Sequence, residues 1–187
     1  MKNFFYKTGW RFGLVLVAWL SLLSAGCGPG KNQVEKVGAA GSGWLNNEFL
    51  LKAEPGNVID VVAARKSEAD VDELTVRGRI GGSLEPWVEN RAAFSLVDAS
   101  IKACSDGTPE GEACSCDTPW DYCCKTDELK GAVLLVKFVD QDGKVVKQDA
   151  RELFGIRELQ QVVVRGAAQR DSSGNLTILA RKMFVHR

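Results

Sequence analysis

QVVVRGAAQRDSSGNLTILARKMFV, residues 161–185, decides the fold of this 187-residue chain. Residues 161–168 and 176–185 are rich in β-branched and other apolar side chains, which favours two strands. Between them, residues 171–175 are Asp, Ser, Ser, Gly and Asn, the residue types that form turns. The stretch therefore predicts a β-hairpin that closes the fold.

Three more strands are predicted upstream of this hairpin. Residues 74–80 (LTVRGRI) alternate apolar and polar side chains with a period of two, and Gly81-Gly82 ends the run. A second strand is predicted from Phe94 through Asp98 and on to Lys102. A third is predicted over residues 132–139 (AVLLVKFV). Together with the hairpin they make five short strands.

Two helical segments complete the predicted elements, at residues 57–68 and 150–154. Five strands, a small helix between the third and fourth, and a closing hairpin resemble the OB-fold, a small Greek-key barrel. The resemblance implies a mainly β fold: an OB-like five-stranded barrel over residues 74–185, with one N-terminal helix and a cysteine-rich loop insertion at residues 103–125. Glycines at positions 78 and 166 suit the tight bends that such a barrel needs.

The N-terminus has the three parts of an export signal. Lys2, Lys7 and Arg11 are the only charged residues before Cys27, and an apolar stretch, FGLVLVAWLSLL, follows at residues 12–23. That stretch is shorter than the roughly 20 residues that a permanent membrane-spanning helix needs. The segment therefore predicts a cleaved signal peptide over residues 1–26.

LLSAGC, which ends at Cys27, resembles the lipobox of bacterial lipoproteins. The resemblance implies cleavage before Cys27 and a lipid on its thiol, so the membrane is an expected partner. It also implies an extracytoplasmic location in the bacterial cell envelope, on the periplasmic side. Because Gly28 and not Asp follows the cysteine, the outer membrane is favoured.

The mature chain is expected to have a linker followed by one domain. Residues 27–43 are rich in glycine, which predicts a flexible linker, and residues 44–187 form the domain. Loss of residues 1–26 takes the formal net charge from zero to −3. That charge argues against nucleic acid as a partner, because nonspecific binding needs many contacts between basic side chains and phosphates.

Five cysteines follow Cys27, and all of them fall within residues 104–124. Disulfides are the favoured interpretation, because exported proteins reach an oxidising compartment, and we then expect no cofactor. A second interpretation is a zinc or copper(I) site, since several thiolates in one loop suit a soft metal. A third is a thiol redox protein that uses the unpaired fifth cysteine. The candidate residues are Cys104, Cys114, Cys116, Cys123 and Cys124.

His186 is the only histidine of the chain and a weak candidate ligand. ELFGIRELQQVVVRG (residues 152–166) and ILARKMFVHR (residues 178–187) resemble the closing region of the haem chaperones of cytochrome c maturation. Those chaperones are membrane-anchored OB-folds, so the resemblance implies haem handling as one form of the metal hypothesis. A single histidine next to the C-terminal residue argues against a Ser-His-Asp triad or a histidine-based zinc enzyme, and we identify no catalytic residue.

Basic side chains of the predicted strands supply a candidate binding face. OB-folds bind oligonucleotides or oligosaccharides on one side of the barrel, and four arginines alternate with apolar residues on these strands. We therefore expect a non-enzymatic, lipid-anchored binding or structural module that contacts an envelope protein or a glycan. The candidate face consists of Arg77, Arg79, Arg165 and Arg181.

Overall fold

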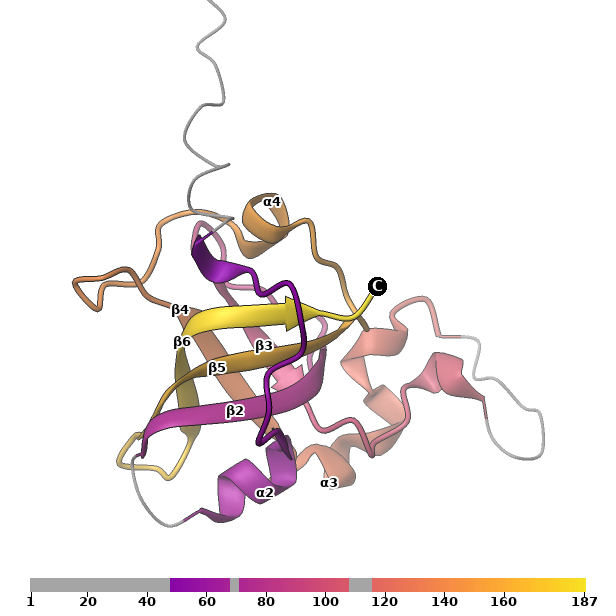
Figure 1. Cartoon of the computed structure of the whole chain (residues 1–187). Helices are drawn as coiled ribbons and strands as arrows, with labels where there is room; N and C mark the ends of the chain where they lie inside the picture. Colours follow the sequence, from indigo (N-terminus) through magenta and orange to yellow (C-terminus); the bar gives the residue numbers. More distant parts are fainter. Residues whose placement is uncertain (1–47, 68–70, 108–115) are drawn as a thin grey trace, which may run out of the picture. The chain divides into compact units, whose positions relative to one another are not determined.

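The computed structural model describes residues 48–67, 71–107 and 116–187, and its centre is a closed barrel (Figure 1). β2 (Val71–Ile80) is long enough to pair with β3 (Ala93–Val97) at one end and with β5 (Gln161–Arg170) along its length. The strand order is therefore β2-β3-β4-β6-β5 and back to β2. This is the predicted OB-like five-stranded barrel.

The hairpin formed by β5 and β6 (Leu176–Val185) has the predicted antiparallel register. β6 also pairs in parallel with β4 (Val133–Phe138), which lies between β3 and β6. A parallel pair needs a long crossover, and residues 139–175 supply it with α4 (Ala150–Phe154) and β5. The short helix predicted at residues 150–154 is thus confirmed.

The barrel interior is a continuous apolar core. Inward-facing side chains alternate along each strand, as Leu134, Val136 and Phe138 do on β4. Phe154 of α4 and Phe49 close one end of the barrel, with their ring centroids 4.6 Å and 5.5 Å from that of Phe138. α4 therefore packs against this end of the barrel through aromatic contacts.

Gly166 allows β5 and β6 to approach each other closely. The register of the two strands shifts between Arg165 and Gly166, as at a β-bulge. A Cβ atom at position 166 would lie 2.0 Å from the carbonyl oxygen of Leu179. Glycine is the residue that fits this position without movement of the β6 backbone.

The N-terminal helix is shorter than predicted, because its first residues join the sheet. The prediction of a helix over residues 57–68 is wrong at its start. Ile59 and Asp60 form β1 (Ile59–Asp60), which pairs in parallel with Val76 and Arg77 of β2. Only α2 (Val61–Lys66) is helical, and residue 68 lies outside the described residues. A valine-rich sequence can form a helix or a strand. Here the free edge of β2 favours a strand, because Ile59 and Asp60 can pair with it.

The second predicted strand also ends early. β3 stops at Val97, whereas the sequence predicted a strand as far as Lys102. Asp98 accounts for the stop, because its carboxylate accepts hydrogen bonds from the backbone N–H groups of Ser100 and Val62. These bonds turn the chain away from the sheet and lower the pKa of Asp98, although burial opposes the shift.

Residues 50–60 cross the outer face of the barrel over β6, β5 and β2 (Figure 1). Leu51 donates its backbone N–H to Met183 at one end of the crossing, and β1 pairs with β2 at the other. Over the described ranges, no helix is both long and apolar enough to span a membrane. The crossing segment determines which side of the barrel can meet a ligand.

Candidate metal centre

Four cysteine sulfur atoms lie close together beside the barrel. Cys104, Cys116, Cys123 and Cys124, called here the cysteine cluster, have sulfur atoms that all lie within 4.8 Å of one another. The Cys123 sulfur is 3.6 Å from that of Cys116 and 3.7 Å from that of Cys124. The sequence placed these residues in one loop, and the structure brings them together.

The cluster has the dimensions of a tetrathiolate metal site. Zinc binds cysteine sulfur at about 2.3 Å in a tetrahedron, which separates the sulfurs by about 3.8 Å. Two of the six separations, 3.6 Å and 3.7 Å, match the edges of that tetrahedron, and all six lie within 4.8 Å. A disulfide needs sulfur atoms about 2.05 Å apart. The arrangement therefore suits four ligands around one ion.

Arg79 of β2 positions the first cysteine. Cys104 begins the 3₁₀ turn η1 (Cys104–Asp106), and the Asp106 carboxylate binds the Arg79 guanidinium and accepts the backbone N–H of Ala103. Arg79 also donates to the carbonyl oxygen of Leu159, so it links the turn to the barrel. The hydrogen bond from Arg79 lowers the pKa of Asp106. Arg79, predicted from the sequence to lie on a ligand-binding face, thus supports the cysteine cluster instead.

Tyr122 positions the other end of the cluster. Its side chain is fully buried with Val97, Ile101 and Ala132 in a second, smaller core. Its backbone has a φ of +55°, so the chain reverses between η2 (Pro119–Asp121) and η3 (Cys123–Lys125). Burial raises the pKa of the Tyr122 phenol. Sequence reasoning missed this anchor; the signal was a large aromatic directly before two cysteines.

η2 is fixed to the residues that follow β2. The carbonyl oxygen of Trp120 accepts a hydrogen bond from the backbone N–H of Gly82 at 2.8 Å. The Trp120 indole N–H donates to the carbonyl oxygen of Leu84 at 3.1 Å. A Cβ atom on Gly81 would lie 2.6 Å from the Trp120 carbonyl oxygen, so this contact needs glycine. Asp121 accepts the backbone N–H of Cys123 and orients η3. The cluster thus joins three turns to one end of the barrel.

The four thiols differ in exposure. Cys104 is buried, Cys116 is half-buried, and Cys123 and Cys124 are exposed. Burial disfavours the Cys104 thiolate, but hydrogen bonds from Cys124 and the other thiols outweigh it and lower the pKa of Cys104. Hydrogen bonds to Cys123 and Cys104 raise the pKa of Cys116 to about 12. Four thiolates this close together would repel one another, and a bound cation would neutralise their charge.

The interpretation that disulfides hold the loop stays a prediction. Among the cysteines that the structure describes, no disulfide forms, and Cys114 lies outside the described residues. The physical reason is geometric: the four sulfurs point toward one centre, which places each near several others. What the loop has is a candidate metal centre.

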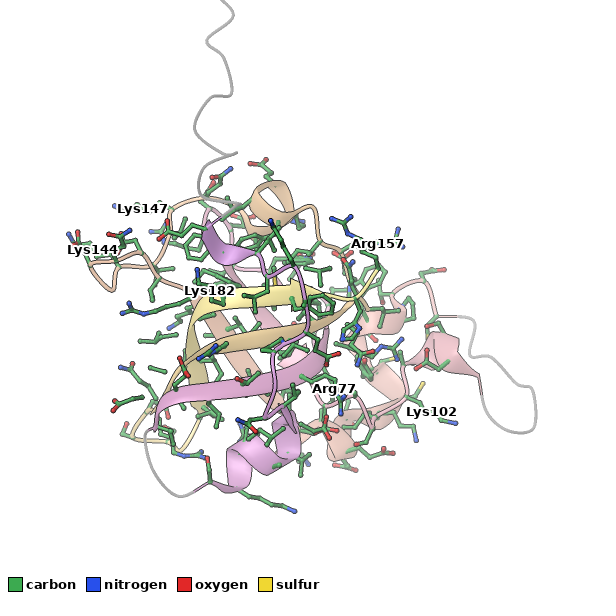
Figure 2. The ribbon with its side chains drawn as sticks, in the orientation of Figure 1. Arg77, Lys102, Lys144, Lys147, Arg157 and Lys182 are labelled. Carbon is green, nitrogen blue, oxygen red and sulfur yellow. The ribbon has the colours of Figure 1, made fainter. Side chains whose placement is uncertain are left out.

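The predicted arginine face is largely occupied by the chain itself. Arg181 is exposed, and the other three arginines bind carboxylates. Figure 2 shows Arg77 and Lys182 on the side of the barrel that residues 50–60 cross, and Lys182 donates to the carbonyl oxygen of Glu48. The ion pairs are Arg77 with Asp60 at 3.1 Å, Arg79 with Asp106, and Arg165 with Glu73 at 2.5 Å.

His186 does not join the cysteine cluster, whose described members are all cysteines. Its ring lies 5.0 Å from that of Phe184, edge to face, and its Nε2 atom is 3.7 Å from a carboxylate oxygen of Glu54. That nitrogen is buried, so it is not open to haem in this arrangement. The residues present therefore do not fit haem attachment.

A groove of about 700 Å³ lies beside β3, β4 and β6, and both polar and apolar side chains line it. In OB-folds the face formed by the second and third strands, here β3 and β4, binds oligonucleotides and oligosaccharides. Its lining includes Ser95, Val133, Leu135, Lys137, Asn175 and Thr177.

Comparison of the sequence with models of known families and with curated proteins gave no match. Function therefore has to be inferred from the site and not from relatives. Two features carry that inference: the cysteine cluster and the groove beside β4.

Proposed function

We propose that the chain is a lipid-anchored, non-enzymatic binding module of the bacterial envelope whose cysteine-rich loop is held by one zinc ion. The observation that carries the proposal is the cysteine cluster, with four sulfurs within 4.8 Å of one another. Four protein thiolates fill a tetrahedral zinc site and leave no position for a catalytic water. The ion would therefore brace the loop, as in other structural zinc sites.

Zinc suits this ligand set better than the alternatives. Copper(I) also prefers thiolates, but a tetrahedral set of four sulfurs is typical of zinc or iron. In an iron–sulfur cluster the thiolates bind different irons, whereas these four sulfurs converge on one point. Zinc is colourless and redox-inactive, so absorption spectra separate it from a single iron held by the same sulfurs.

The binding role rests on the barrel and its groove. The loop is fixed at one end of the barrel, and the groove lies between β4 and the residues around Asn175. Hydroxyl and amide groups beside Leu135 offer hydrogen bonds and a small apolar surface, which suits a glycan or a segment of an envelope protein. The mature charge of −3 disfavours a nucleic acid.

Loss of one ligand should abolish zinc binding. We expect Cys123→Ser to lower the zinc content from one ion per chain to near zero, because a neutral hydroxyl does not replace a thiolate. The matched control is Cys114→Ser, which should keep one ion, since the cysteine cluster already supplies four ligands. Atomic absorption on the purified variants gives both values. Equal zinc in the two variants would contradict the assignment.

The lipid anchor has a separate test. We expect Cys27→Ala to abolish incorporation of labelled palmitate and to move the protein from the membrane fraction to the soluble fraction. The reason is that the thiol of Cys27 is the acceptor that the lipobox resemblance implies. Labelling of the variant at the level of the unchanged chain would disprove lipidation at this residue.

A further inference from the structure

We propose that Cys116 and Cys123 form a thiol-oxidation site whose closure to a disulfide releases the zinc ion. The inference rests on the proposed zinc site and concerns its regulation. Two observations carry it: their sulfurs lie 3.6 Å apart, and both residues are reachable from solvent. The sulfurs need to approach by roughly 1.5 Å to reach disulfide distance, which side-chain rotation can supply.

The geometry selects this pair over the other short one. Cys123 and Cys124 have sulfurs 3.7 Å apart but are neighbours in sequence. Their Cα atoms are fixed at about 3.8 Å by the trans peptide, whereas disulfides span about 4.4 to 6.8 Å between Cα atoms. A disulfide between adjacent residues would therefore be strained.

Burial protects Cys104 from oxidation. Cys104 is 7% exposed and packs beside the turn that Arg79 and Asp106 hold. An oxidant from solvent therefore meets Cys116, Cys123 or Cys124 before it meets Cys104. Six residues separate Cys116 and Cys123, including the chain reversal at Tyr122, so a ring can close between them.

The reaction balances with hydrogen peroxide as the oxidant. Two zinc-bound thiolates each give up one electron and form the S–S bond. Peroxide takes the two electrons and, with two protons, becomes two water molecules. Zinc then keeps two of its four sulfur ligands and leaves as Zn²⁺, and the two remaining thiolates take protons from water.

Release of the ion would loosen one end of the barrel. η2 lies between the two oxidised residues, and its Trp120 accepts the backbone N–H of Gly82 and donates its indole N–H to the carbonyl oxygen of Leu84. Leu84 is 60% exposed, so these bonds are among the few contacts that hold it, together with the bond from Gly81 to the carbonyl oxygen of Ser95. The oxidised and zinc-bound forms should therefore differ at residues 81–84.

The experiment uses the full chain loaded with zinc, and the Cys114→Ser variant as its matched control. One equivalent of peroxide is added, free zinc is read with a metallochromic dye, and the chain is then cut before aspartate. That digest places Cys104 on residues 98–105, Cys114 and Cys116 on residues 106–116, and Cys123 and Cys124 on residues 121–126. Mass spectrometry should find the last two peptides linked, with one zinc freed per disulfide in both proteins. Fragmentation of the linked peptides should place the bond on Cys123.

Three outcomes would go against the inference. Zinc that stays bound after the link forms, a link that includes Cys104, or a link within residues 121–126 would each overturn it. A chain without zinc before peroxide would overturn the proposed function instead. The peptide map of that reduced chain would still show whether Cys116 and Cys123 are the pair that closes.

Discussion

Gly166→Ala is expected to destabilise the barrel by about 3 kcal/mol or more, one of the largest effects of a single methyl group in this chain. The added Cβ would lie 2.0 Å from the carbonyl oxygen of Leu179 and 2.7 Å from the Cα of Ala180. Both atoms are backbone, so no side-chain rotation relieves the clash. β6 has to move, and its pairs with β5 and β4 move with it.

Urea unfolding followed by circular dichroism measures the effect. Gly56→Ala is the matched control, because no atom lies within 4 Å of a Cβ at that position. This control should fall within about 0.5 kcal/mol of the unchanged chain. A Gly166→Ala variant as stable as the control would show that β5 and β6 do not approach as closely as described.

Zinc affinity is expected to fall steeply as the pH drops below neutrality, by about tenfold per pH unit for each thiol that loses a proton when zinc binds. Metal binding needs thiolates, so protons leave the cysteines when zinc enters, and each proton released contributes a factor of about ten per pH unit. Hydrogen bonds from the Cys116 thiol to Cys123 and Cys104 raise the pKa of Cys116 to about 12, so it gives up a full proton near neutral pH when zinc binds. The pKa of Cys104 is lowered, so we expect this thiol to contribute a smaller share of the released protons than Cys116 does.

The sign follows from the same exchange. High pH favours the zinc-bound chain, and the stability that zinc adds is lost as pH falls, because zinc then dissociates. Competition with a chelator of known affinity, between about pH 8 and pH 6, gives the slope. The Cys114→Ser variant should give the same slope. An affinity independent of pH would mean that the ion is not held by thiolates.

The barrel was predictable because its strands carry strong local patterns. The alternation at residues 74–80 and the turn residues at 171–175 each appear as the strand and turn they predict. The errors arose where tertiary contacts outweigh local preference. Ile59 and Asp60 join the sheet because β2 offers a free edge, and β3 ends because Asp98 binds backbone N–H groups.

The candidate site was only partly predictable. The sequence showed that the cysteines share one loop, but convergence of their sulfurs depends on contacts distant in sequence. Arg79 reaches Asp106 across 27 residues, and Tyr122 enters a core formed by Val97 and Ala132. The expected extracytoplasmic location favoured disulfides. The positions of the four sulfur atoms are what favour a tetrathiolate site.

The most direct test of the zinc-braced loop is intact mass together with metal analysis. It uses the chain from residue 28 onward, purified from an oxidising compartment in its untreated state. We predict one zinc per chain in the native protein and, after denaturation, the mass of five reduced thiols. A mass lower by four hydrogens with no metal would contradict the account, because the loop would then be held by two disulfides.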